Sequence, residues 1–175
     1  FTEQSQRFRP NSKEEQVLQR ACEHFEATLI SIQGQLAGSV AAMEPRHSNE
    51  ALNYGEIFVR DNVPVMIYLM LQGRFSIVKH FLSVSLQLQS TSVQTRGVFP
   101  TSFVEENGQL VADYGQRSIG RITSVDASLW WPVLCWIYVK RSGDTAFGRS
   151  PEVQRGIQML LDLVLHPSFE GTPAL

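Results

Sequence analysis

The sequence predicts an all-α fold made of stacked helix pairs. Apolar residues recur at steps of three and four along several segments, which is the spacing of one face of an α-helix. Two segments open with helix-capping signals, Ser12 with Glu15 and Ser150 with Pro151 and Glu152. Loops of uneven length separate the helical segments, an order typical of helix pairs packed side by side.

The chain begins with ten polar, aperiodic residues that we expect to form an N-terminal arm, residues 1–10. Ser12 and Glu15 then form a capping box, in which each side chain satisfies the backbone N–H of the other residue. We expect the helix that follows to continue to about Gly34 or Gly38. The helical spacing is kept by Val17, Leu18, Ala21, Cys22, Phe25, Leu29, Ile32 and Leu36.

Four further helices are predicted, over residues 62–72, 75–89, 126–141 and 151–165. Pro64 falls in the first turn of its helix, where a missing N–H is tolerated. Pro132 has to lie near the first turns of the next-to-last helix, or it kinks that helix. The last helix begins at the Ser150 cap.

Residues 90–121 form the longest predicted loop. They contain Asn107-Gly108, a sequence that favours a tight hairpin turn. Short β-prone runs at 97–99 and 109–111 flank this turn, so we expect a small β-hairpin inside the loop. Long structured loops in helical domains are more often functional than idle.

Composition excludes several classes of protein. Of the 175 residues, 43 % are hydrophobic and 18 % are charged, which excludes disorder. A net charge of −2 and scattered arginines argue against nucleic acid and anionic membranes as partners. No apolar run is long enough to span a bilayer. The two cysteines, Cys22 and Cys135, do not have the spacing of metal ligands, and the four histidines do not have it either. We therefore expect no metal and no cofactor. This cysteine usage fits a cytoplasmic protein.

Two acidic residues stand at predicted helix starts among apolar neighbours. Asp61 follows Arg60, and Asp126 opens the helix that carries Trp130 and Trp131. Each acid has a structural interpretation as an N-cap, with the arginine in solvent and the tryptophans in the core. Each also has a functional one, because carboxylates and guanidinium groups bind sugar hydroxyls while indoles stack on the C–H face of a sugar. The residues alone leave both interpretations open.

Several short motifs together resemble the alkaline/neutral invertases, which form glycoside hydrolase family 100. Their order and spacing fit this family from about residue 38 to residue 175. The matching pieces are Glu50-Ala51-Leu52-Asn53-Tyr54, Phe58-Val59-Arg60-Asp61, Gly97-Val98-Phe99-Pro100-Thr101-Ser102-Phe103, Ala112-Asp113-Tyr114-Gly115, Ile119-Gly120-Arg121-Ile122, Ser124-Val125-Asp126 and Leu129-Trp130-Trp131. No single piece is specific, but the set is.

The resemblance implies a part of an (α/α)6 toroid, a six-hairpin barrel, that hydrolyses sucrose or a related α-glucoside with inversion. It also implies that Asp126 is the general acid. The general base is a glutamate in a Tyr-Gly-x-Pro-x-Glu-like motif that does not occur in these 175 residues. We therefore expect residues 11–175 to be the N-terminal part of a single glycosidase domain, cut at both ends. The expected sugar-binding residues are Phe58, Arg60, Asp61, Arg121, Trp130 and Trp131.

Three positions depart from the family pattern. Asn62 replaces an aromatic residue, Gln116 replaces a glutamate and Ala127 replaces a serine, each beside an expected site residue. These changes predict an altered pocket for the leaving half of the substrate. The alternative function is a non-catalytic helical protein that binds sugars or assembles with others. The expected partner is a small sugar, and a homo-oligomer is compatible with the sequence.

Overall fold

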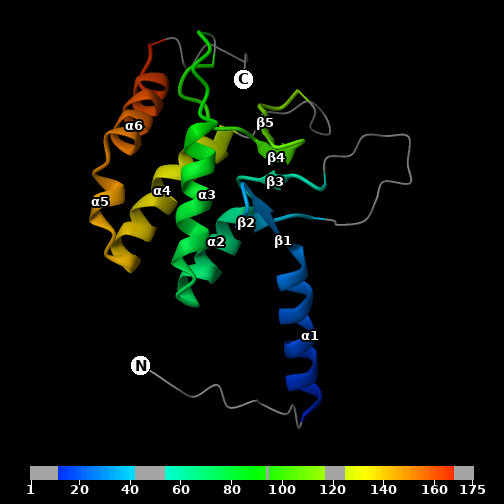
Figure 1. Cartoon of the computed structure of the whole chain (residues 1–175). Helices are drawn as coiled ribbons and strands as arrows, with labels where there is room; N and C mark the ends of the chain where they lie inside the picture. The colour runs from blue at the N-terminus through cyan, green and yellow to red at the C-terminus, as the bar shows by residue number, and fades with distance from the viewer. Residues whose placement is uncertain (1–11, 42–53, 94, 117–124, 168–175) are drawn as a thin grey trace.

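The computed structural model describes residues 12–41, 54–93, 95–116 and 125–167. The expected arm at 1–10 lies outside these ranges. The described residues form six α-helices and two small antiparallel sheets (Figure 1). The fold is therefore helix-rich, as predicted, but it is not purely α-helical because both sheets contribute side chains to the core.

The first helix, α1 (Lys13–Thr28), begins at the predicted capping box. The backbone N–H of Glu15 donates to Ser12 Oγ at 3.1 Å, and the N–H of Ser12 donates to the Glu15 carboxylate at 3.0 Å. The helix extends away from the other helices, and none of its residues is buried (Figure 1). Its last turn contacts α2 through the rings of Phe25 and Tyr68, whose centroids are 5.1 Å apart.

The prediction that this helix continues to Gly34 or Gly38 is wrong. A hairpin follows it at once, made of β1 (Leu29–Ile32) and β2 (Gln35–Ser39). The turn between the strands places Gln33 and Gly34 at φ values of 52° and 76°, a left-handed pair that ends any helix. The β-branched isoleucines of β1 favour this extended conformation. A helical spacing of apolar residues alone did not distinguish the two outcomes.

Three helices, α2 (Asn62–Leu71), α3 (Phe75–Gln87) and α4 (Val125–Ser142), form the centre of the molecule. All three agree with the predicted helices to within a few residues. They contact one another and bury most of the core, in which Trp131 is the largest fully buried side chain. Pro132 lies inside α4, well past its first residue.

The second sheet lies beside this helical centre and has the strand order β3 (Ile57–Phe58), β4 (Ser102–Glu106) and β5 (Gln109–Asp113). Strands β4 and β5 form the predicted hairpin, and its turn residues Asn107 and Gly108 have φ values of 52° and 77°. The sheet pairs β3, which ends two residues before Arg60, with β4, the strand that follows residues 97–101.

The first strand of that hairpin is not at 97–99, where the sequence predicted it. Gly97 has a φ of +97°, and a Cβ atom at this position would lie 2.4 Å from the carbonyl oxygen of Met159. The segment therefore packs against the backbone of α6 (Pro151–Val164) rather than against a neighbouring strand. The start of α6 agrees with the prediction, since Ser150 Oγ accepts a hydrogen bond from the N–H of Val153 at 3.3 Å.

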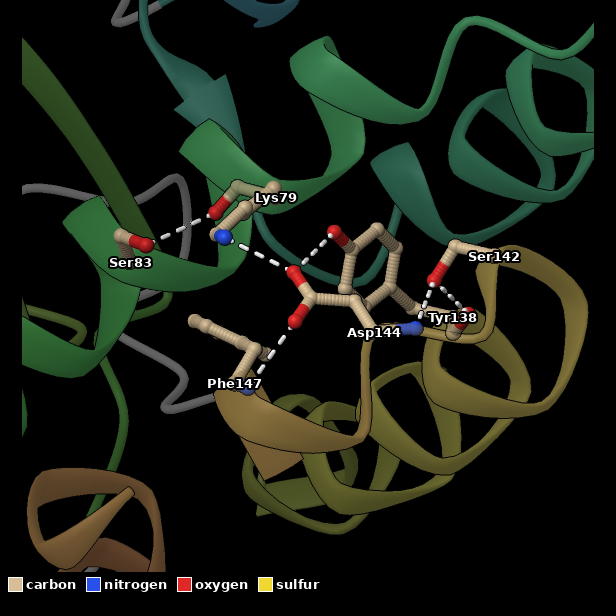
Figure 2. A network of polar contacts seen from close by, with 6 residues as sticks. All are labelled: Lys79, Ser83, Tyr138, Ser142, Asp144 and Phe147. Atoms are coloured by element: carbon tan, nitrogen blue, oxygen red, sulfur yellow. Dashed lines mark hydrogen bonds and ion pairs between the residues drawn. The ribbon is translucent and has the colours of Figure 1, made fainter. Parts of the chain in front are cut away.

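A short helix that the sequence analysis missed, α5 (Thr145–Gly148), begins at Asp144. Figure 2 shows the Asp144 carboxylate accepting hydrogen bonds from Lys79 Nζ at 2.7 Å, from Tyr138 Oη at 2.9 Å and from the N–H of Phe147 at 3.0 Å. The Lys79 bond is the main cause that lowers the pKa of Asp144 to about 2. This carboxylate thus connects α3, α4 and α5 at the end of α4 opposite to Asp126.

Candidate active site

The arginine and the two acidic residues that the sequence singled out lie together in the structure. Asp61 immediately precedes α2, and Asp126 lies in the first turn of α4. Arg60 stands between them, with its Nε 3.9 Å from Asp61 Oδ2 and its Nη1 3.8 Å from Asp126 Oδ1. The starts of two helices far apart in the sequence thus meet at one cationic side chain.

These three side chains are accessible to a ligand. The exposed fractions are 55 % for Arg60, 64 % for Asp61 and 47 % for Asp126. Both separations from Arg60 exceed the usual length of a charge-assisted hydrogen bond, about 2.7–2.9 Å. The guanidinium group therefore attracts both carboxylates and keeps N–H groups available to other acceptors. Such a group of donors and acceptors suits the adjacent hydroxyls of a sugar.

Asp61 does not have the structural role that its position suggested. It occupies the N-cap position of α2, but its side chain makes no capping hydrogen bond, and its backbone is already helical with φ −69° and ψ −24°. An N-cap residue normally has an extended backbone and accepts a hydrogen bond from the first turn. The carboxylate is therefore directed to solvent and to Arg60.

The next residue, Asn62, holds the Arg60–Asp61 segment in place. Its side chain is only 2 % exposed. Its Oδ1 accepts a hydrogen bond from the N–H of Ser39 at 2.8 Å, and its Nδ2 donates to the carbonyls of Ser39 and Phe58, both at 2.9 Å. Asn62 therefore joins β2, β3 and the start of α2. Because it is buried, Asn62 can alter the substrate pocket only through the residues that it positions, and that effect stays a prediction.

The two tryptophans of α4 differ in their surroundings. Trp131 is fully buried, stacks on Phe99 with ring centroids 4.8 Å apart and donates from its indole N–H to Ser85 Oγ at 3.0 Å. Trp131 is therefore a core residue, with no exposed surface for the sugar contact expected from the sequence. Trp130 is 39 % exposed, so its ring is available to a ligand.

The other predicted site residues, and the other positions that depart from the family pattern, differ in how exposed they are. Phe58 is half-buried at the end of β3. Arg121 lies outside the described residues. Ala127 is fully buried, whereas Gln116 is exposed and accepts a hydrogen bond from the N–H of Tyr114 at 3.0 Å. Two of the three family departures, Asn62 and Ala127, are thus buried in the scaffold around the site.

The motif that ends β5 has a structural role that the sequence analysis did not assign. Asp113 is 1 % exposed, and its Oδ1 accepts hydrogen bonds from the N–H groups of Gly115 at 3.0 Å and Gln116 at 2.8 Å. The Tyr114 hydroxyl donates to the carbonyl of Leu88 at 2.5 Å, and burial raises the pKa of Tyr114. These contacts bind the loop after β5 to the end of α3.

Within the described ranges, no three histidine, cysteine, aspartate or glutamate side chains are grouped so as to hold a metal ion. None of the helices in this part of the chain is long and apolar enough to cross a membrane.

Comparison with known proteins identifies the family. The profile of the alkaline and neutral invertase family matches residues 21–175. The chain belongs to the alkaline/neutral invertase family. It is 35 % identical over 171 residues to the alkaline/neutral invertase CINV1 of Arabidopsis thaliana, a match that covers 91 % of the chain and 31 % of that invertase. The resemblance drawn from the sequence motifs is confirmed.

Two rice invertases are similarly related. The chain is 37 % identical over 165 residues to the mitochondrial neutral/alkaline invertase 1 of Oryza sativa subsp. japonica, covering 85 % of the chain and 26 % of that invertase. It is 35 % identical over 167 residues to cytosolic invertase 1 of the same organism, covering 89 % of the chain and 30 % of that invertase.

The chain thus spans between 26 % and 31 % of the length of these three invertases. Their names assign one to the cytosol and another to the mitochondrion. Membership of the invertase family therefore does not decide the compartment, and the cytoplasmic location stays a prediction.

Proposed function

We propose that this chain carries the general-acid side of the active site of a glycosidase that hydrolyses sucrose, or a related α-glucoside, with inversion. The observation that supports the proposal most is the position of Arg60 between the carboxylates of Asp61 and Asp126, in a chain of the invertase family. We further propose that residues 11–175 are the N-terminal part of a single (α/α)6 domain.

In the proposed reaction, Asp126 donates its proton to the glycosidic oxygen as the bond from that oxygen to the anomeric carbon breaks. The leaving sugar departs as an alcohol. A water molecule attacks the anomeric carbon from the opposite face and gives its proton to a second carboxylate, about 6.5–9.5 Å from the first in inverting enzymes. The glutamate motif expected to supply that base does not occur in these 175 residues.

Arg60 supports this chemistry electrostatically. As the proton leaves, Asp126 becomes a carboxylate, and the Arg60 Nη1 atom lies 3.8 Å from its Oδ1. A fixed positive charge near a developing negative charge stabilises the transition state. Asp61 and the remaining N–H groups of Arg60 then bind sugar hydroxyls, and Phe58, Trp130 and Arg121 complete the proposed sugar-binding set.

The surface of α4 supports the proposal of a larger helical ring. Leu129, Val133 and Trp136 repeat at helical spacing and are 49 %, 42 % and 63 % exposed. Residues four and three apart lie on one face of a helix, so these side chains form an apolar stripe. Such a stripe is covered in the proposed domain by helices of the same ring.

The experiment compares two substrates in the full-length protein. Sucrose has a poor leaving group that needs a proton, whereas α-glucosyl fluoride releases fluoride with little need of an acid. In Asp126→Asn, sucrose turnover should fall by about 10²–10⁴-fold, because a general acid contributes that much. Turnover of α-glucosyl fluoride should fall far less.

Asp61→Ala serves as the comparison variant. Asp61 binds substrate in this proposal, so its loss should lower kcat/KM for both substrates by similar factors. Proton NMR of the first glucose released should show the β-anomer, as inversion requires. Release of the α-anomer, or equal losses on both substrates in Asp126→Asn, would contradict the assignment. A wild-type protein that binds sucrose without cleaving it would favour the non-catalytic alternative.

A further inference from the structure

A buried backbone segment, residues 97–101, connects the two parts of the site. The carbonyl of Thr101 accepts a hydrogen bond from the N–H of Val59, the residue before Arg60, at 2.9 Å. Two residues earlier, the N–H of Phe99 donates to Ser128 Oγ at 2.9 Å. The same short segment thus contacts the backbone beside Arg60 and the first turn of α4, which carries Asp126.

The ion pairs at the site do not set its geometry by themselves. Arg60 is 3.8 Å from Asp126 and 3.9 Å from Asp61, and all three side chains are largely exposed. Exposed pairs of this kind contribute about 0–1 kcal/mol and hold their partners loosely. The spacing between Arg60 and Asp126 must therefore come from the backbone contacts beneath them.

The first turns of α4 need an anchor outside the helix. Pro132 has no N–H, so the helix lacks the hydrogen bond that residue 132 would donate to the carbonyl of Ser128. Ser128 lies two residues after Asp126 and is 4 % exposed. Its hydroxyl connects this weakened turn to the 97–101 segment, and Phe99, which donates to it, also stacks on Trp131 of the next turn.

We propose that Ser128 is a positioning residue for the general acid. Its hydroxyl, held by the N–H of Phe99, fixes the first turn of α4 so that the Asp126 carboxyl meets the glycosidic oxygen beside Arg60. This inference rests on the proposed function. Ser128 touches no substrate in this account and acts only through Asp126.

The test uses Ser128→Ala in the full-length protein with sucrose and α-glucosyl fluoride as substrates. A misplaced catalytic group costs on the order of 10²-fold, so we expect kcat on sucrose to fall by about 10–100-fold. The KM for sucrose and the turnover of α-glucosyl fluoride should stay close to those of the wild type. A purely structural role would lower turnover of both substrates by the same factor.

Ser85→Ala is the matched control. Ser85 is also buried, and its hydroxyl, which donates within its own helix, also accepts one hydrogen bond from a core group, the indole N–H of Trp131. Loss of the Ser85 hydroxyl should lower the melting temperature without changing the ratio of sucrose turnover to α-glucosyl fluoride turnover. If Ser128→Ala does not fold stably, Ser128→Cys replaces it, because sulfur is only a weak acceptor at a similar volume.

Two results would overturn the inference while the proposed function stands. One is sucrose turnover in the Ser128 variant equal to that of the wild type, and the other is an equal loss on both substrates. A wild-type protein that hydrolyses neither substrate rejects the proposed function itself, and this inference with it. The positioning role is supported if the Ser128 variant loses turnover on sucrose alone, while Ser85→Ala changes the turnover of both substrates by the same factor.

Discussion

Replacing Asn62 with aspartate is expected to loosen the support beneath Arg60 and Asp61. The change keeps the volume and shape of the side chain, so no cavity forms. It converts Nδ2, which donates to the carbonyls of Ser39 and Phe58 at 2.9 Å, into an oxygen that faces both carbonyls. The bond from the N–H of Ser39 to Oδ1, at 2.8 Å, can remain.

The magnitude follows from the two donors that are lost. A buried polar group left without its hydrogen bond costs about 1–3 kcal/mol, so two such carbonyls cost about 2–6 kcal/mol. A tenfold change in an equilibrium constant corresponds to about 1.4 kcal/mol. A cost of at least about 2 kcal/mol therefore makes local opening at least about 30-fold more frequent. The opening should concern β2, β3 and the start of α2, which the Asn62 side chain connects.

Hydrogen exchange followed by mass spectrometry measures this opening in peptides that cover residues 35–40 and 57–62. Asn107→Asp is the matched control, because Asn107 lies in the exposed turn between β4 and β5 and its side chain has no such buried role. Faster exchange should appear in the Asn62 variant only. Equal exchange in both variants would refute the idea that Asn62 holds this segment.

Two further predictions concern stability. The pKa of Asp144 is lowered from 3.8 to about 2, so its contribution to stability is complete above about pH 4 and is lost as the pH falls towards 2. The difference in unfolding free energy between wild type and Asp144→Asn, measured by denaturant titration, should therefore shrink over this range. A difference that stays constant would exclude the Lys79 bond as its source. Gly97→Ala should destabilise the protein by more than about 1 kcal/mol, since the new Cβ would meet the Met159 carbonyl at 2.4 Å with φ at +97°. Gly108→Ala, with a left-handed φ but open space around it, should lower the melting temperature less, and equal shifts would argue against the close approach at Gly97.

Local signals in the sequence were sufficient for several elements. The Ser12–Glu15 capping box, the Ser150 cap and the Asn107-Gly108 turn each involve residues within a few positions of one another. Such interactions depend little on the rest of the chain, so the starts of α1 and α6 and the β4–β5 turn agree with the prediction. The family could also be identified from the sequence alone, because its motifs are patterns of residue types along the chain.

The sequence was not sufficient to predict the structure where one local pattern is compatible with two different structures. Leu29, Ile32 and Leu36 continue the helical spacing of α1, but they belong to two antiparallel strands. Strand pairing depends on contacts across the hairpin and on packing beneath it, which an apolar spacing does not contain. The adjacent tryptophans Trp130 and Trp131 are also equivalent as letters, yet only one of them faces the core.

The sequence by itself determined that Asp126 stands at a helix start within a family motif, and that Arg60 and Asp61 precede another helix. Only the tertiary structure decided that these two helix starts meet, with Arg60 Nη1 3.8 Å from Asp126 Oδ1. Beside these helix starts, the segment at 97–101, Asn62 and Ser128 form hydrogen bonds that join residues distant in the chain. Contacts between distant residues arise from the packing of the whole core, and no local pattern of residues encodes them.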